Sequence, residues 1–367
     1  MKILLFRSNN IFASRVNKYV NYYKRLELDY TIIGWDREGE AKLVEHYDFC
    51  KYKASTNVGG IKAMIAHTKW MWFVFKYLMN HKDVTTIHAC DLNVAFPAAL
   101  FKMLFKREVI LIFDVCDWFS ANFSKYSKLC KVLNVMEKFA CKQANYIIIC
   151  EPERKAQIQF SIDKEPLVLP NIPEIDNNYI FEKENKYSFN NDKITIAYFG
   201  GFSNDRFLTE LLDLTKNSTF NLLIAGYGSK DIENKCRDLE KMENVKFFGR
   251  LDMKEGLQMS YNADIIYMMY CKSNMNHIYA APNKYYEALF LGKPLITTKG
   301  IIVENKVHKN DIGYSVEENI DELNELILSL NKMELENKGK NAKKLWDDVY
   351  CRYVNDFFEN IYSKIIH

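Results

Sequence analysis

The sequence predicts an α/β protein made of two similar domains, and three observations lead to this. The chain has 367 residues, which is more than one ordinary hydrophobic core contains. Short apolar runs alternate with longer mixed segments, as expected for parallel sheets covered by helices on both faces. The alternation stops at a polar segment near the middle of the chain and then starts again. Each half is therefore expected to be a doubly wound sheet with its own core.

The first half contains five apolar, β-branched runs of the kind that form strands buried on both faces. They are Ile3–Phe6, Tyr30–Trp35, Thr86–Ala89, Val109–Val115 and Tyr146–Cys150. Segments long enough for helices lie between them, at Ser14–Leu26, Ile61–Asn80 and Leu129–Gln143. Strand, helix and strand in this order favour a parallel sheet.

The pattern breaks between Asn171 and Lys193, where prolines are followed by charged and amide residues typical of a linker. A second set of expected strands follows: Ile194–Phe199, Leu222–Ala225, Val245–Phe248, Asp264–Tyr270 and Pro294–Thr298. The segment Leu345–Ile366 is expected to be an aromatic amphipathic helix that covers another surface. The predicted boundaries are a first domain at 1–175, a linker at 176–193, a second domain at 194–344 and the helix at 345–367.

Composition excludes several other classes of protein. A hydrophobic share of 48% and a charged share of 26% indicate a globular chain. The net charge of +3 argues against a dedicated nucleic-acid binder. The nine cysteines form no C-x-x-C pair, which argues against a zinc ribbon. No signal peptide or apolar run of about 18 residues is present, so a cytoplasmic protein without a membrane span is expected.

A glycine pair follows the first expected strand of the second half, in the stretch Tyr198–Arg206. Glycines at such a turn let the backbone approach a ligand closely. A helix is expected to begin near Asp205 and to offer free N–H groups to an anion. Arg206 adds a guanidinium that can pair with phosphate oxygens. From these residues alone, a binding loop and an ordinary strand-to-helix turn remain equally open.

A helix is predicted over Asn283–Leu291, closed by Gly292 and stopped by the proline two residues later. Asn283 and Lys284 then lie at the helix start, where a phosphate is favoured. Glu287 lies on the same face as Lys284, and its carboxylate can accept hydrogen bonds from two vicinal ribose hydroxyls. Taken alone, a surface ion pair on a solvated helix is the better interpretation.

The two stretches together are more specific, because they stand in an order typical of one family. From Ile194 to about Thr298, the chain resembles the donor domain of family 4 glycosyltransferases and close relatives. The shared motifs, in order, are the Gly-Gly loop with its arginine, Leu223–Gly228, Val245–Arg250, Tyr261–Asp264 and the helix from Pro282 to Pro294. The first half is similar, less closely, to the acceptor domain of bacterial surface-polysaccharide enzymes, at Arg7–Asn10, Arg15–Val16, Gly34–Arg37, Ile87–Asp91 and Asp114–Asp117.

The resemblance covers most of the chain and implies the GT-B fold, with two Rossmann-like doubly wound domains facing a central cleft. It implies a donor site in which Arg206 and Lys284 neutralise a diphosphate and Glu287 holds the ribose. The full set of expected donor-binding residues is Gly200, Gly201, Arg206, Gly226, Arg250, Asn283, Lys284 and Glu287. Gly226 and Arg250 would lie near the nucleobase.

In the first domain, the resemblance implies that Asp117 and His88 are catalytic residues near the acceptor. Residues expected on the acceptor side are Ser8, Asn9, Arg15 and Asp91. A buried, hydrogen-bonded histidine is an equally good interpretation of His88, which ends a predicted strand. A functional role is favoured for Asp117, because the carboxyl ends of strands line the crevice in doubly wound sheets.

Two departures from the family pattern affect the expected chemistry. Such enzymes often carry two glutamates separated by seven residues, and Tyr279 stands where the first would be. The glycine-rich loop after the first strand is replaced by Ser8–Asn10. Retention of anomeric configuration is thus an expectation from the family. No Asp-x-Asp occurs, so no metal cofactor is expected, and positive side chains with helix termini would neutralise the diphosphate instead.

The stretch from Phe49 to Lys82 has six lysines and no acidic residue. It includes the aromatic segment Trp70–Met79. Basic charge beside aromatic residues suits a helix at a membrane interface, so a peripheral membrane contact through 61–82 is one interpretation. A core helix with a basic outer face is the other, and it is slightly favoured.

These observations predict a hexosyl-type glycosyltransferase (EC 2.4) that uses a UDP- or GDP-linked sugar. The expected acceptor is a glycan or a lipid-linked glycan of bacterial capsule, O-antigen or exopolysaccharide synthesis. The reaction would take place in the cytoplasm or at the inner face of the membrane. The alternatives are a sugar-nucleotide epimerase or hydrolase of the same fold, and a catalytically silent nucleotide-sugar-binding subunit. No nucleic acid is expected as a partner.

Overall fold

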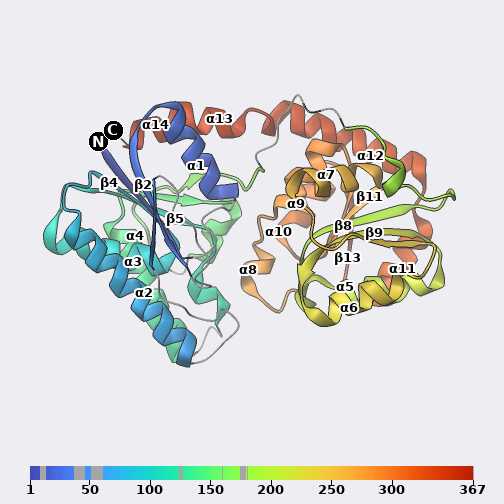
Figure 1. Cartoon of the computed structure of the whole chain (residues 1–367), viewed down its shortest axis with the longest axis horizontal. Coiled ribbons are helices and arrows are strands. Elements are labelled where there is room, and N and C mark those ends of the chain that lie inside the picture. Colours follow the sequence, from blue (N-terminus) through green and yellow to red (C-terminus); the bar gives the residue numbers. More distant parts are fainter. Residues whose placement is uncertain are drawn as a thin grey trace. The chain divides into compact units, whose positions relative to one another are not determined.

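The computed structural model describes residues 1–8, 14–36, 46–50, 61–123, 127–158, 160–173, 179 and 181–366 (Figure 1). The chain folds into two compact units. The first unit combines Met1–Asn171 with Val354–His367, and the second is Ile172–Tyr353. Each unit has a parallel sheet with helices on both faces, which confirms the predicted fold class.

Within the described residues, the first unit has a seven-stranded sheet with the order β3-β2-β1-β4-β5-β6-β7. All neighbouring strands are parallel. The strands are β1 (Lys2–Arg7), β2 (Asp29–Trp35), β3 (Tyr47–Cys50), β4 (Thr86–Cys90), β5 (Ile110–Val115), β6 (Tyr146–Ile149) and β7 (Leu167–Val168). The order reverses between β1 and β4, so the crevice at the carboxyl ends of these strands is where a doubly wound sheet binds ligands.

Two helical layers cover this sheet. One layer consists of α2 (Ile61–Asn80), α3 (Leu92–Phe105) and α4 (Lys128–Gln143), whose inner side chains form one apolar cluster with the sheet. The other consists of α1 (Ser14–Arg25) and the C-terminal helical segment, which form a second cluster on the opposite face (Figure 1). Two short turns, η1 (Phe119–Asn122) and η2 (Pro152–Gln157), follow β5 and β6.

The described part of the second unit has a six-stranded sheet with the order β10-β9-β8-β11-β12-β13. Its strands are β8 (Thr195–Phe202), β9 (Asn221–Gly228), β10 (Val245–Phe247), β11 (Ile265–Met268), β12 (Leu295–Thr298) and β13 (Gly313–Val316). Its α-helices are α5 (Leu208–Leu214), α6 (Lys230–Leu239), α7 (Met253–Asn262), α8 (Met275–Ile278), α9 (Asn283–Leu291), α10 (Ile302–Lys309), α11 (Ile320–Ser329) and α12 (Lys332–Leu345). Short 3-10 turns are η3 (Asn185–Tyr187), η4 (Asn204–Arg206) and η5 (Thr215–Asn217).

After α12, the chain remains helical but alternates between α and π geometry. The segments are η6 (Trp346–Tyr350), α13 (Tyr353–Phe357), η7 (Phe358–Tyr362) and α14 (Ser363–Ile366), with η6 and η7 in π geometry. Trp346 packs against Phe290 of the second unit. Phe358 and Tyr362 are buried in the first unit against Tyr19. The single amphipathic helix expected over Leu345–Ile366 is therefore a longer and interrupted helical run.

The ten strands expected from apolar runs are all present, and the short strands β3, β7 and β13 were missed. These three strands lie at sheet edges. The segment expected as a linker over 176–193 includes Tyr187, which is buried against Phe248 of the second unit with ring centroids 4.9 Å apart. The contacts divide the chain after Asn171 and after Tyr353; the boundaries at 175 and 344 stay predictions.

None of the helices in the described ranges combines the length and the apolar character that crossing a membrane requires.

Candidate functional site

A cavity of about 560 Å³ opens in the second unit at the carboxyl ends of β8 and β9. This is the edge at which doubly wound sheets bind ligands. The lining residues come from five parts of the chain: Phe199, Gly200, Gly201, Gly226, Tyr227, Leu251, Met253, Tyr270, Ala281, Pro282, Asn283, Lys284 and Glu287. Six of the eight donor-binding residues predicted from the sequence are among them.

The glycines keep the floor of the cavity open. Gly200 on β8 pairs with Gly226 on β9, and both have positive φ angles, 147° and 156°. A Cβ on Gly226 would meet the carbonyl oxygen of Gly200. Any side chain at Gly226 would therefore force the two strands apart, and its absence leaves the backbone accessible to a ligand.

Helix α9 begins at the cavity, as the sequence predicts, and ends at Gly292 with a φ of 63°. Its N-cap residue Pro282 makes no side-chain capping bond. The first amides of the helix are thus available beside Asn283 and Lys284, both of which line the cavity. Free N–H groups and the helix dipole favour an anion at this position.

Lys284 and Glu287 are the charged lining residues, and neither side chain makes a hydrogen bond or ion pair with another described residue. Burial lowers the pKa of Lys284 to about 8, and the nearby positive charge of Arg206 acts in the same direction. Burial also raises the pKa of Glu287 to about 7, against the influence of Lys284. Both groups are therefore short of polar partners, which a ligand with phosphates and hydroxyls would supply.

Arg206 does not line the cavity, but its guanidinium lies over the ring of Tyr270, which does, with Cζ 4.1 Å from the ring centroid. Its Nη1 atom lies 3.3 Å from Asp205 Oδ1 and 3.3 Å from His277 Nε2. His277 Nδ1 lies 3.0 Å from the carbonyl oxygen of Cys271. Since a carbonyl only accepts, Nδ1 carries a proton and donates it to Cys271, while Nε2 lies 3.3 Å from both Arg206 Nη1 and Asp205 Oδ2. His277 and Asp205 thus orient the guanidinium.

The helix expected near Asp205 starts later. Asn204–Arg206 form a 3-10 turn, Phe207 adopts a left-handed conformation with φ 52°, and α5 begins at Leu208. A helical turn thus begins near Asp205 as expected, but it is a 3-10 turn, and on this side of the cavity the positive charge comes from the Arg206 side chain.

Arg250 likewise stacks on an aromatic residue of the lining. Its Cζ lies 4.4 Å from the ring centroid of Tyr227, a lining residue. The loop before it is joined to β9 by a hydrogen bond from Gly226 N to Gly249 O of 2.7 Å. The two predicted donor residues outside the lining therefore each stack on an aromatic residue of the lining.

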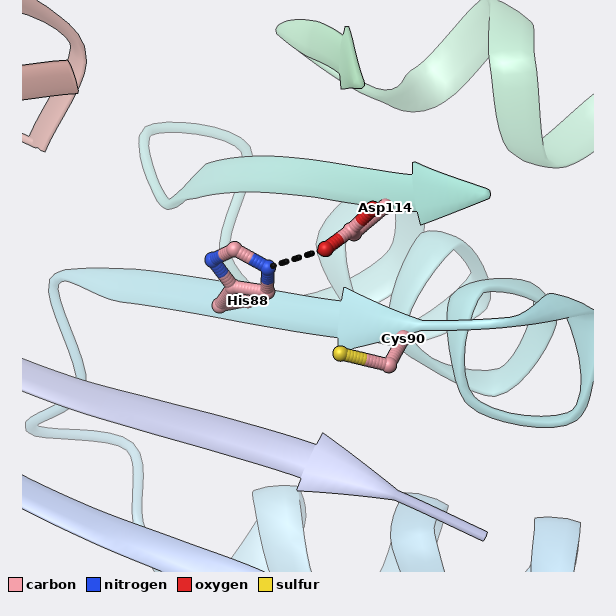
Figure 2. Close-up of side chains that lie close together, drawn as sticks. All are labelled: His88, Cys90 and Asp114. Carbon is pink, nitrogen blue, oxygen red and sulfur yellow. Dashed lines mark hydrogen bonds and ion pairs between the residues drawn. The ribbon is translucent and has the colours of Figure 1, made fainter. Parts of the chain in front are cut away.

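In the first unit, His88 is buried, and Figure 2 shows its ring pointing towards Asp114. Its side chain has no exposed surface, and burial lowers its pKa, so the ring is neutral. Nε2 lies 3.3 Å from Asp114 Oδ2, and Nδ1 lies 2.8 Å from the hydroxyl of Tyr362. With both ring nitrogens engaged, the structure favours the alternative of a buried histidine over the expected catalytic role.

Arg15, expected on the acceptor side, belongs to the same buried network. Its guanidinium donates to both oxygens of Asp114, and Nη2 lies 2.5 Å from Oδ1. Nη1 donates to Leu169 O at 2.8 Å and to Asn171 Oδ1 at 3.0 Å. Burial opposes ionisation of Asp114, but Arg15 and His88 hold its pKa below the usual range.

His88, Cys90 and Asp114 lie close enough to share a metal ion (Figure 2). The chemistry of this group does not fit one. Asp114 already accepts hydrogen bonds from Arg15, Tyr19 and His88, and the charge of Arg15 would repel a cation. Burial raises the pKa of Cys90, which keeps the thiol protonated and a poor ligand.

The two expected carboxylates of the first unit differ in environment. Burial raises the pKa of Asp91 to about 6, with Asp117 acting in the same direction and Arg7 against it. Asp117 is mostly exposed and forms an ion pair of 2.9 Å with Arg154. A carboxyl group with a pKa near 6, such as that of Asp91, suits proton transfer near neutral pH. Among the other acceptor-side residues, Ser8 is buried and Asn9 lies outside the described residues.

The sequence analysis missed two arginines at the carboxyl edge of the first sheet. Arg7 ends β1 and Arg154 follows β6, and each has two buried guanidinium nitrogens without a hydrogen-bond partner in the described structure. It also missed the aromatic residues Tyr227 and Tyr270. A signal was present in each case, because these residues lie at or just after the carboxyl ends of strands, where doubly wound sheets bind ligands.

Comparison with known proteins places these features in a family. Residues 180–345 match the family model described as glycosyl transferases group 1. No curated protein sequence matches the chain. Sucrose-phosphate synthase from Thermosynechococcus elongatus has a similar structure, with a TM-score of 0.74 and 14% identity over 100% of this chain and 99% of that one.

Two further solved structures share the fold over nearly their whole length. Anabaena HepE in complex with UDP and glucose has a TM-score of 0.71 at 14% identity, covering 99% of this chain and 100% of HepE. WaaG, a glycosyltransferase involved in lipopolysaccharide biosynthesis, has a TM-score of 0.67 at 12% identity, covering 98% of this chain and 100% of WaaG. The protein is therefore a glycosyltransferase (EC 2.4) with a group 1 glycosyltransferase domain at residues 180–345, and the whole chain has the GT-B fold of these solved structures.

Proposed function

We propose that the protein transfers a sugar from a UDP- or GDP-linked donor to a glycan or lipid-linked acceptor, with retention of configuration, in bacterial surface-polysaccharide synthesis. The observation that carries the donor assignment is the pair Lys284 and Glu287, which lie in one cavity without hydrogen-bond partners among the described residues. A nucleoside diphosphate supplies an anion for the first and hydroxyls for the second.

Each donor residue has a distinct part in this proposal. Lys284, Arg206 and the first amides of α9 neutralise the diphosphate, which is the leaving group and gains negative charge in the transition state. Glu287 accepts hydrogen bonds from the ribose hydroxyls. Gly200 and Gly226 let the donor approach the backbone, and Arg250 with Tyr227 forms the side of the cavity proposed for the base.

UDP is favoured over GDP as the nucleotide, because the solved structures of HepE contain UDP or UDP-glucose. The polysaccharide acceptor rests on the resemblance to WaaG and to a lipopolysaccharide outer core galactosyltransferase, WaaB. On the acceptor side, Asp91 and Asp117 are the proposed polar contacts. His88 and Arg15 are left out because both are buried and hydrogen-bonded.

The donor assignment is tested by calorimetry with UDP and GDP. Glu287→Ala and Arg206→Ala should each weaken binding of the preferred nucleotide, since loss of a hydrogen bond to a charged group costs about 1.5–3 kcal/mol. Lys230→Ala, at an exposed position on α6, is the matched control and should bind normally. Unchanged affinity in both site variants would overturn the assignment.

The transfer reaction is tested with a panel of UDP- and GDP-sugars, with and without lipid-linked and free glycan acceptors. Turnover that requires an acceptor supports a transferase. Conversion of the sugar nucleotide without an acceptor would identify an epimerase or hydrolase. Binding without turnover on any acceptor would identify a silent binding subunit.

A further inference from the structure

The helical layer α2–α4 of the first unit has an unusual outer surface. The inner residues of α2, such as Trp70, Val74 and Leu78, pack into the core. The outer stripe has the spacing of one helix face, and it alternates lysine with apolar residues: Lys62, Ile65, Lys69, Trp72 and Lys76. Trp70 is 1% exposed and Trp72 is 66% exposed. The helix thus places one tryptophan in the core and holds another outward.

The outer side of α3 and α4 continues this pattern. Leu104 and Phe105 at the end of α3 are exposed, and the ring of Phe105 lies 6.0 Å from that of Phe75 on α2. On α4, Val132 and Val135 are exposed, the latter at 69%. Apolar side chains on three neighbouring helices therefore face outward on one side of the unit, which Figure 1 shows as the α2–α4 side of the first sheet.

The charge of the same layer has one sign. The three helices contain eight lysines, seven of them exposed. They contain one carboxylate, Glu137, which is buried and accepts hydrogen bonds from the Ser120 backbone amide and hydroxyl at 3.0 and 2.6 Å. No acidic residue of these helices reduces the positive charge of the outer surface. We call this surface, formed by the outward residues of α2, α3 and α4, the basic apolar face.

We propose that the basic apolar face binds an anionic phospholipid bilayer, with Trp72, Phe105, Val132 and Val135 entering the interface and the lysines meeting lipid phosphates. Charge complementarity selects this occupant: lysines with apolar neighbours on one face are what a membrane-surface element requires. A nucleic acid would use the lysines but would leave the valines and leucine in contact with water. This inference rests on the proposed function, because a lipid-linked acceptor lies at such a surface, and it extends the contact expected through 61–82 to α3 and α4.

Flotation of the purified full chain with vesicles tests the proposal. The wild-type chain should float with vesicles of phosphatidylcholine and phosphatidylglycerol, less in high salt, and not with phosphatidylcholine alone. The triple variant Lys62→Glu, Lys69→Glu, Lys76→Glu should partition on the order of 100-fold more weakly. The α4 variant Lys131→Glu, Lys138→Glu, Lys142→Glu should lose binding to a similar extent. The control variant Lys230→Glu, Lys241→Glu, Lys344→Glu has the same change of charge in the second unit and should float like the wild type.

Tryptophan fluorescence gives a second readout from the geometry of the face. The other four tryptophans, at 35, 70, 118 and 346, are each at most 6% exposed, so acrylamide quenches mainly Trp72 in solution. Addition of anionic vesicles should remove most of this quenching and shift the emission to the blue. The variant Trp72→Phe should show neither change while it still floats.

The results separate this inference from the donor assignment, because UDP binding is measured in the same samples. Loss of flotation in the α2 and α4 variants with unchanged UDP affinity supports the proposal. A wild-type chain that binds UDP but does not float overturns it and leaves the proposed function intact. Normal flotation of the α4 variant overturns the three-helix face. The membrane proposal is also overturned if the wild-type chain binds neutral vesicles as strongly as anionic ones. Binding to polyglutamate as strong as binding to anionic vesicles overturns it as well.

Discussion

The two sheets differ in whether the charged side chains discussed above have hydrogen-bond partners within the chain. In the second unit, Lys284 and Glu287 line a cavity, and each has a pKa shifted by burial towards its neutral form. In the first unit, Asp114 is fully buried but is held ionised by the guanidinium of Arg15 and by His88. Two sheets of similar topology therefore differ in this respect: the second unit has charged groups without hydrogen-bond partners, and the first has a charged group whose partners lie within the chain.

The difference shows which charges serve the fold and which serve a ligand. Burying a charge without a partner costs free energy. A site that contains such a charge is therefore expected to gain the missing partner from a bound ligand. A buried charge whose hydrogen bonds are all made within the chain stabilises the unit and is closed to substrate. By this criterion, we expect Lys284 and Glu287 to contact a ligand, whereas His88 and Arg15 are buried and bonded within the first unit.

The largest expected effect concerns stability. Asp114→Ala leaves Arg15 buried without its counter-charge and should lower the free energy of unfolding by about 3–5 kcal/mol. Lys284→Met removes a half-buried charge that makes no hydrogen bond or ion pair with the described residues, although its ammonium lies 4.5 Å from the ring centroid of Tyr198, and should leave the free energy of unfolding nearly unchanged. Urea denaturation followed by circular dichroism measures both. The double variant Asp114→Ala, Arg15→Met should recover part of the loss, and a Lys284→Met variant as unstable as Asp114→Ala would contradict the comparison.

The next effect is a change in proton binding when the donor binds. Because the pKa of Lys284 is about 8 in the free protein, roughly half of these side chains are neutral at pH 8, and a bound diphosphate should raise that pKa. UDP binding at pH 8 should then take up about half a proton. Calorimetry in buffers of different ionisation enthalpy measures this uptake, which Lys284→Met should abolish. Affinity should also fall as the pH rises through 8, and a flat profile would argue against an ion pair.

The same pKa predicts a dependence of stability on pH without ligand. Lys284 has a lower pKa in the folded chain than the value of about 10.4 in an unfolded one. Between about pH 8 and 10.4 the unfolded chain binds more protons, so this residue should make stability rise with pH in that window. The difference between the wild type and Lys284→Met, measured by thermal unfolding across this range, isolates the effect.

A smaller effect is expected from His277, which holds Arg206 without lining the cavity. His277→Ala should weaken UDP binding roughly threefold to tenfold, the value of one ordinary hydrogen bond. Binding of uridine, which has no phosphate, should stay the same. His308→Ala, which changes an exposed histidine on α10, serves as the control. Equal loss for UDP and uridine would indicate a general disturbance of the fold.

The smallest expected effect is that of EDTA. Arg206, Lys284 and the start of α9 provide the positive potential for the diphosphate, so UDP affinity and transfer should not change when divalent ions are removed. The assay compares protein dialysed against EDTA with protein supplied with Mn²⁺ or Mg²⁺. Loss of activity in EDTA and recovery with Mn²⁺ would mean that the donor site is built differently.

The parts of this molecule that the sequence predicts well depend on local signals. The helix over Asn283–Leu291 has a glycine at its end and a proline beyond it, so its bounds and the positions of Lys284 and Glu287 follow from neighbours in sequence. The buried strands follow from apolar runs. The assignment of these residues to a donor site came from the family resemblance, since the residues alone favoured a surface pair.

The parts that were missed depend on contacts distant in sequence. His88 is buried because Tyr362, 274 residues away, covers it, and no local pattern reveals that contact. No glycine stands at Asn204–Arg206 or at Phe207, so the sequence does not predict the 3-10 turn or the left-handed residue after it. Arg206 and Arg250 are placed by stacking on Tyr270 and Tyr227, which depends on how separate loops meet at the sheet edge.

The division of the chain into units has a consequence for the order of folding during synthesis. The second unit, Ile172–Tyr353, is continuous in sequence, whereas the first needs Val354–Ile366 to complete its core. Until that segment has left the ribosome, Tyr19 and His88 lack the aromatic rings and the hydroxyl that Phe358 and Tyr362 supply. The half that is made first is thus completed last, and the second unit can fold while the core of the first is still open on one face.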